Sequence, residues 1–121
     1  MKYATVLLLT LSASPALANF TCVVERQCGG GACEAFSGGP LTLREAAGAW
    51  QVGLGGAEWE AYPVTEIAPG GEINLVIPPQ DGMSGLITVT PAGALAFTAH
   101  AGSEDGLVAI TGEGTCTSEA G

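Results

Sequence analysis

Three of the four cysteines in this chain fall within twelve residues, from Cys22 to Cys33, and the fourth is Cys116, close to the other end. In a short exported chain, four cysteines are typical of two disulfide bonds. A bond between an early cysteine and Cys116 would hold the two ends of the fold side by side. The cysteines therefore limit the possible folds more than any other feature, provided that the chain is exported.

The first eighteen residues have the pattern of a secretory signal peptide. Lys2 gives a basic start, residues 4–11 are apolar, and Ala16-Leu17-Ala18 matches a small-x-small cleavage site. We expect cleavage near Ala18 to leave one domain of residues 19–121, located in the periplasm or secreted. The apolar stretch is too short to span a membrane as a helix, so we expect no membrane insertion.

Strand periodicity favours one of the three possible cysteine pairings. Cys22 alternates with apolar residues of the first strand. Cys116 has the parity of Val108 along the last strand, if no glycine between them introduces a bulge. Both cysteines would then face the core, which pairs Cys22 with Cys116. Cys28 and Cys33 would form a small ring whose three glycines permit a tight backbone path.

A zinc site is the alternative use of these cysteines. Structural zinc sites favour two close cysteine pairs, whereas the spacing here is C-x5-C-x4-C, with Cys116 far away. His100 could supply one further ligand. Calcium could bind Ser103-Glu104-Asp105, but the spacing of a calcium loop is missing. We therefore expect neither a metal nor a cofactor.

Turn signals indicate an all-β fold. The chain contains 19 glycines and 7 prolines, and turn-forming clusters arrive every eight to twelve residues. We expect a small antiparallel barrel or sandwich of six to eight strands in a meander, stapled by disulfides. Strands are expected at 20–24, 50–54, 57–62, 72–77 and 107–116, with loops at 25–40 and 78–82.

Two further segments remain: one has a clear secondary-structure prediction, and the other is compatible with two. Residues 86–100 predict a β-hairpin around Pro91-Ala92-Gly93, with apolar residues of both arms facing the core. Those residues are Ile87, Val89, Leu95 and Phe97. Residues 41–49 fit either a short helix, begun by the capping box Thr42-Leu43-Arg44-Glu45, or a strand.

The charge is strongly negative. The formal net charge is −9, and loss of Lys2 with the signal peptide leaves two arginines against twelve acids, a net charge of −10. Such a surface repels phosphate backbones and anionic lipids, so we expect no nucleic-acid partner. It would attract a basic protein or an envelope component, or simply keep the protein soluble.

Candidate catalytic groups are few. His100 is the only histidine, no lysine remains after the signal peptide, and no serine lies in a nucleophile motif. Glu58 and Glu60 share one strand face and could act as a carboxylate pair. A solvated strand face that includes Tyr62 is the simpler interpretation, and we take these three residues as a possible binding face rather than a catalytic site. Trp50 and Trp59 are expected in the core.

The chain resembles small exported β-proteins of Gram-negative bacteria that have no assigned function. The shared features are Thr21-Cys22, Cys28 with Cys33, Trp50-Gln51-Val52, the hairpin at 86–100 and Gly114-Thr115-Cys116. Its size, disulfide bonds and strand content are also similar to those of the periplasmic inhibitors of c-type lysozyme, which are eight-stranded barrels. Their inhibitory loop reads Ser-Gly-x-x-Tyr, and the matching segment here is Ser37-Gly38-Gly39-Pro40-Leu41.

These features favour an exported, non-enzymatic binding protein of the cell envelope. The alternatives are a lipocalin-like carrier of a small apolar ligand, with its site in the barrel interior, and a lysozyme-inhibitor-like protein. The carrier predicts an apolar cavity of a few hundred Å³, about the size of known ligand pockets.

Overall fold

The computed structural model describes residues 19–67, 70–104 and 106–119; the predicted signal peptide and its cleavage site lie outside these ranges. Nine strands and no helix are found within them, so no described helix is long and apolar enough to cross a membrane. The strands are β1 (Asn19–Gly29), β2 (Ala32–Ala35), β3 (Leu41–Ala46), β4 (Ala49–Leu54), β5 (Ala57–Pro63), β6 (Ile73–Gln80), β7 (Met83–Val89), β8 (Ala94–Ser103) and β9 (Gly106–Glu119).

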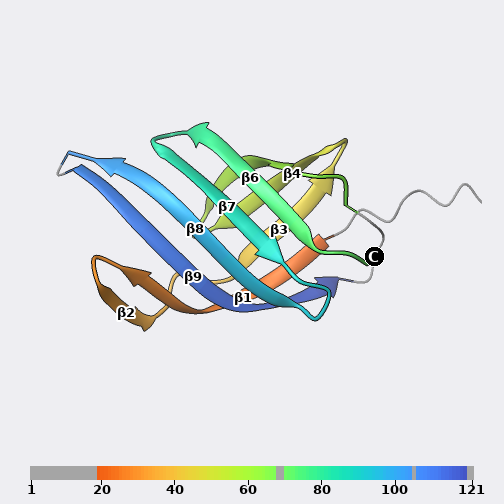
Figure 1. Cartoon of the computed structure of the whole chain (residues 1–121), viewed down its shortest axis with the longest axis horizontal. Helices are drawn as coiled ribbons and strands as arrows, with labels where there is room; N and C mark the ends of the chain where they lie inside the picture. Colours follow the sequence, from red (N-terminus) through yellow and green to blue (C-terminus); the bar gives the residue numbers. More distant parts are fainter. Residues whose placement is uncertain (1–18, 68–69, 105, 120–121) are drawn as a thin grey trace, which may run out of the picture.

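The strands form a closed antiparallel barrel, which confirms the predicted all-β class. From β3 to β9 each strand pairs with its successor, and β1 pairs with both β3 and β9, so the sheet closes on itself (Figure 1). Eight strands make the barrel. The ninth, β2, is an extra strand that pairs with the far half of β1.

The prediction of a loop at 25–40 is wrong for most of these residues. β1 continues to Gly29 and returns as β2, and the register places Cys28 opposite Cys33. Gly30 and Gly31 make the turn between them, with φ angles of 60° and 84°. Because two glycines with positive φ are enough for a hairpin turn, the glycine cluster interrupts the strand for only two residues.

Residues 41–49 adopt the strand alternative. Leu41 and Leu43 are buried and the intervening residue is half-buried, which is the alternation of a strand rather than a helix. Ala47 and Gly48 then form a two-residue turn, with φ angles of 52° and 84°. The capping-box sequence therefore lies within a strand and caps nothing.

The loop expected at 78–82 is also too long. β6 runs to Gln80, and only Asp81 and Gly82 form the turn, both with positive φ. The register between β6 and β7 shifts between Ile77 and Gln80. Proline cannot donate a ladder hydrogen bond, and such an irregularity is where a strand tolerates it. Pro78 and Pro79 are therefore accommodated by a bulge instead of ending the strand.

The hairpin at 86–100 is confirmed. The register places Ile87 opposite Phe97 and Val89 opposite Leu95, and all four pack in or against the core. The core contains thirteen buried apolar residues. These are Cys22, Val24, Leu41, Leu43, Trp50, Val52, Ala61, Ile73, Leu75, Ile77, Ile87, Val89 and Leu95.

One expectation about the last strand is wrong. Val108 was expected to face the core, but its side chain is 43% exposed. Residues 106–109 of β9 pair with β8 alone, residues 110–115 pair with both β8 and β1, and residues 116–119 pair with β1 alone. The tip of the β8–β9 hairpin thus extends beyond the closed part of the barrel. The bulge in this pairing lies in β1, between Val24 and Arg26, so Cys116 keeps its inward parity.

Candidate functional site

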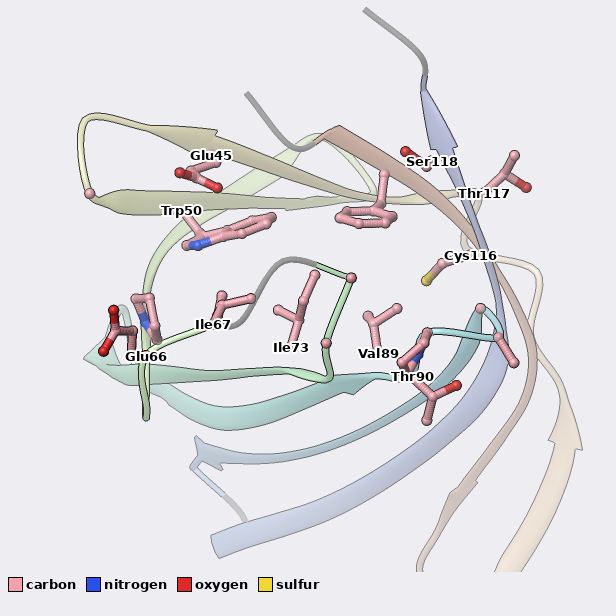
Figure 2. A pocket seen from close by; sticks show the side chains of 18 residues that line it. Glu45, Trp50, Glu66, Ile67, Ile73, Val89, Thr90, Cys116, Thr117 and Ser118 are labelled. Atoms are coloured by element: carbon pink, nitrogen blue, oxygen red, sulfur yellow. The ribbon is translucent and has the colours of Figure 1, made fainter. Parts of the chain in front are cut away.

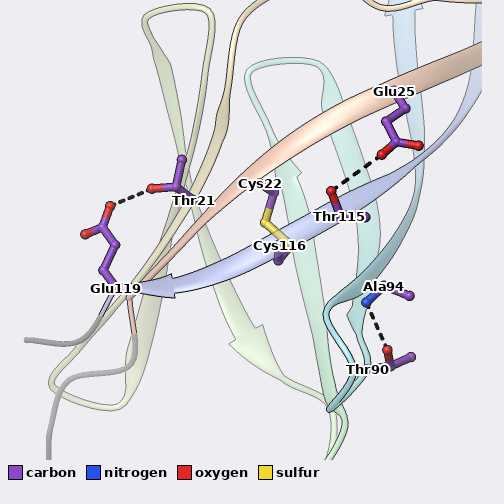
Figure 3. The surroundings of a disulfide bond; sticks show 8 residues. All are labelled: Thr21, Cys22, Glu25, Thr90, Ala94, Thr115, Cys116 and Glu119. Atoms are coloured by element: carbon purple, nitrogen blue, oxygen red, sulfur yellow. Dashed lines mark hydrogen bonds between the residues drawn. A yellow bond between two sulfur atoms is a disulfide. The ribbon is translucent and has the colours of Figure 1, made fainter.

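The two disulfides join β1 to two of its three neighbouring strands, β9 and β2. Cys22 is bonded to Cys116 across the β1–β9 pairing that closes the barrel, and Cys28 is bonded to Cys33 across the β1–β2 pairing. These are the pairs that strand parity favours. Figure 3 shows the first disulfide between two hydrogen bonds from threonine hydroxyls to carboxylates: Thr21 donates to Glu119, and Thr115 donates to Glu25.

The barrel-mouth pocket lies at one end of the barrel. Because the sheet is a meander, the β3–β4, β5–β6 and β7–β8 connections gather at the end where β1 begins and β9 finishes. The pocket there has a volume of about 1010 Å³, and eighteen described residues from these connections and strand ends line it (Figure 2).

The walls of this pocket are mainly apolar and aromatic. Phe20 and Trp50 stack, with ring centroids 6.3 Å apart and an angle of 22° between the rings. Figure 2 shows Ile67, Ile73 and Val89 on the side of the pocket opposite the indole. Apolar walls of this kind suit an apolar molecule, because its transfer from water is favourable.

Two carboxylates also line the pocket. Glu45 lies directly opposite Trp50 in the β3–β4 register, and it is half-buried. Glu66 comes from the segment between β5 and β6 and is exposed. Figure 2 draws Glu45 beside Trp50 and Glu66 on the opposite side, at the level of Ile67, and both lie at the end of the pocket away from Cys116. The pocket therefore combines an apolar wall with a charged border.

Core side chains fill the middle of the barrel. Leu43, Trp50, Val52 and Leu75 are less than 2% exposed and fill it. Phe97 covers Gly112, where an added Cβ would lie 2.3 Å from the ring. The ligand-sized space is thus at the mouth and not in the interior, where the carrier hypothesis had placed it.

The predicted binding face lies on the outside of the barrel. Glu58, Glu60 and Tyr62 alternate along β5 with Trp59 and Ala61, and all three are exposed. The Tyr62 hydroxyl donates a hydrogen bond to the Glu60 carboxylate, and this bond is the largest cause that raises the pKa of Tyr62 above its usual value. Partial burial and the negative charge of Glu60 act in the same direction.

Tyr62 is also the first member of an outer apolar row. The register places Tyr62 opposite Val76 of β6, and Val76 opposite Leu86 of β7. Tyr62 is 39% exposed and Leu86 is 49% exposed. The structure therefore adds Val76 and Leu86 to a face that the sequence could define only along one strand.

The residues considered for metals are separated in the fold. All four cysteines are in disulfides, and His100 is exposed on β8. The described residues contain no group of three potential metal ligands. Asp105, one of the residues considered for calcium, lies outside the described ranges.

Fold and pocket define a class: a small closed β-barrel with two disulfides and a ligand-sized pocket at one end. No protein-family model, curated protein or solved structure matches the chain. Function must therefore be inferred from the pocket and the surface themselves.

Proposed function

We propose that the protein is an exported, non-enzymatic binding protein of the cell envelope that holds a small amphipathic ligand in the barrel-mouth pocket. The supporting observation is a pocket of about 1010 Å³ in a barrel that is otherwise packed. Ligand pockets usually measure about 300–1,000 Å³ and combine apolar walls with a few polar groups. The mouth has this composition, with Phe20 and Trp50 on its wall and Glu45 at its border.

Export to the periplasm or outside the cell is part of this proposal. It is supported by the signal-peptide pattern and by two disulfides, which persist in oxidising compartments. Mass spectrometry of the natural product tests it: we expect a chain that begins near Asn19 and contains no free thiol. A chain that retains Met1 and four thiols would contradict export.

The neutral fluorescent probe N-phenyl-1-naphthylamine tests the pocket. We expect it to bind with a stoichiometry of one, and to bind less tightly to Ile67→Trp, because the larger side chain occupies part of the pocket. Leu86→Ala, a change on the outer face, is the matched control and should leave binding unchanged. Equal loss in both variants, or binding that does not saturate, would contradict a defined site.

The outer face supports a second candidate function, the binding of a basic protein. The row of Tyr62, Val76 and Leu86 lies beside the carboxylates of Glu58 and Glu60, so an apolar contact and a charge contact are available together. A c-type lysozyme is a suitable basic probe. At low salt we expect the protein to slow cell-wall lysis and Leu86→Arg to lose this effect, whereas undiminished lysis would remove this candidate for lysozyme.

The lysozyme-inhibitor motif itself is not the basis of this second candidate. Ser37 is exposed between β2 and β3, but Leu41, at the position of the inhibitory tyrosine, is only 3% exposed and packs in the core. A buried residue cannot be inserted into a partner. The outer row on β5, β6 and β7 is therefore the surface proposed for a protein partner.

A further inference from the structure

We infer that the ligand of the barrel-mouth pocket is an organic cation, with an ammonium group at one end of an apolar body. This inference rests on the proposed function, because it requires the pocket to bind a small molecule. It is carried by the direction in which Glu45 points, by the charges around the pocket and by the aromatic pair on its wall.

Glu45 occupies an interior position of the barrel. Along β3, Leu41 and Leu43 are buried core residues, and Glu45 is the next residue of the same parity. Its partner in the register is Trp50, whose side chain also lies inside. Glu45 is half-buried, whereas Leu41 and Leu43 are buried, so its side chain lies where the packed core gives way to the pocket. The barrel thus directs a negative charge into the space that a ligand would fill.

No positive side chain compensates this charge at the pocket. Glu66 adds a second carboxylate, and none of the described residues that line the pocket is lysine, arginine or histidine. The only described ion pair between side chains, Arg26 with Glu113, joins residues that do not line the pocket. A cation would gain attraction from both carboxylates, whereas an anion would be repelled by them.

The aromatic side chains favour the same sign of charge. The faces of aromatic rings attract cations. Trp50 is buried, and Phe20, which is stacked on it and half-buried, is the aromatic ring that a ligand in the pocket can reach. Ile67, Ile73 and Val89 offer an apolar surface across the pocket for the body of the ligand. An alkylammonium ion matches this lining, because its ammonium group can approach the carboxylates and its alkyl chain can pack on the apolar side chains.

Three ten-carbon compounds that differ only in the head group test the inference: decylammonium, decanol and decanoate. Binding is measured by calorimetry and by tryptophan fluorescence, in a Trp59→Phe background in which Trp50 is the one remaining tryptophan. We expect decylammonium to bind about tenfold more tightly than decanol, from the combined attraction of partly exposed carboxylates and aromatic rings, and decanoate to bind most weakly. The advantage of decylammonium should shrink as salt is added.

Two carboxylate variants identify the origin of the preference. Glu45→Gln and Glu66→Gln should each weaken decylammonium by about three- to fivefold and leave decanol unchanged. Glu34→Gln removes an exposed carboxylate from β2, away from the pocket, and is the matched control, with no expected effect.

The outcomes separate this inference from the proposed function. If decanol binds as tightly as decylammonium, or if Glu45→Gln and Glu66→Gln leave decylammonium unchanged, the pocket stands and the cationic ligand is wrong. If none of the three compounds binds, the pocket is not a ligand site and the proposed function fails with it.

Discussion

Gly114 lies where the barrel closes, and its lack of a side chain is required there. It faces Val24 across the β1–β9 pairing, and an added Cβ would lie only 1.9 Å from the carbonyl oxygen of Val23. A backbone atom cannot move aside as the end of a flexible side chain can. The requirement is therefore steric, since the φ angle of Gly114 is not in the left-handed region.

Gly114→Ala should lower the free energy of unfolding by about 1–3 kcal/mol, the usual cost of overpacking. Urea denaturation measures the change. Gly29→Ala is the control, because its Cβ would meet the nearest atom, the carbonyl oxygen of Ala109, at an ordinary 3.5 Å. If the two variants were equally stable, the close approach at Gly114 would not be a constraint.

Tyr62 gives a residue-scale prediction that depends on pH. Its pKa is raised because the hydroxyl donates a hydrogen bond to Glu60, so folding favours the protonated phenol. The resulting stability is present below the pKa of the unfolded state and is lost as pH rises through the higher folded value. Glu60→Gln should lower the folded pKa toward the ordinary value, measured by phenolate absorbance in the chain without Tyr3. An unchanged titration would contradict the role of Glu60.

At the scale of secondary-structure elements, the pairing between β5 and β6 is unusually short. The ladder there has only two residue pairs, and the side chain of Gln80 extends it. Its amide nitrogen donates to the carbonyl oxygens of Glu60 (2.8 Å) and Pro78 (3.1 Å), and its side-chain oxygen accepts from the Glu60 amide (3.0 Å). Gln80 thus replaces the backbone groups of a missing ladder position.

Gln80→Ala should destabilise the protein by about 1–2 kcal/mol, through the loss of these hydrogen bonds, and should speed hydrogen exchange at the Glu60 amide. Gln51→Ala, a change at an exposed glutamine of β4, is the control and should have little effect. Equal hydrogen-exchange rates of the Glu60 amide in both variants would show that Gln80 does not hold β5 and β6 together.

Elements could be predicted where alternation and turn chemistry agree. The hairpin at 86–100 has both, and its facing residues follow directly. The loops at 25–40 and 78–82 were overestimated, because glycine and proline clusters mark a turn without giving its length. In the structure each turn takes two residues, Gly30-Gly31 and Asp81-Gly82. Strands take up the rest of 78–82, and of 25–40 only residues 36–40 otherwise remain outside a strand.

The pocket could not be predicted for a related reason. Glu45 points inward only if residues 41–46 form a strand, and the capping-box pattern favoured a helix at least as much. Phe20 and Glu66 are distant from Glu45 in the sequence and meet at the mouth only through closure of the barrel. The alternation of Leu41, Leu43 and Glu45 was the one local signal for an inward carboxylate.

At the scale of the whole molecule, the two disulfides should contribute unequally. Cys22–Cys116 spans 94 residues and Cys28–Cys33 spans 5. In the chain-entropy model, loss of the long ring costs about 4–5 kcal/mol and loss of the short ring roughly 2 kcal/mol. Paired serine variants, each removing one bond, are compared by urea denaturation. A larger cost for the short ring would contradict an entropic origin.

The pairing of Asn19 with Glu119 places the start of β1 and the end of β9 side by side at the rim of the pocket. Any peptide fused to either end would crowd the entrance and compete with what binds there. A circular permutant that joins these neighbouring ends by a short linker, and opens the chain at Gly55-Gly56 on the opposite rim, would carry its tag away from the entrance. Immobilisation through that permutant, and not through the natural ends, is the orientation in which ligand capture should succeed.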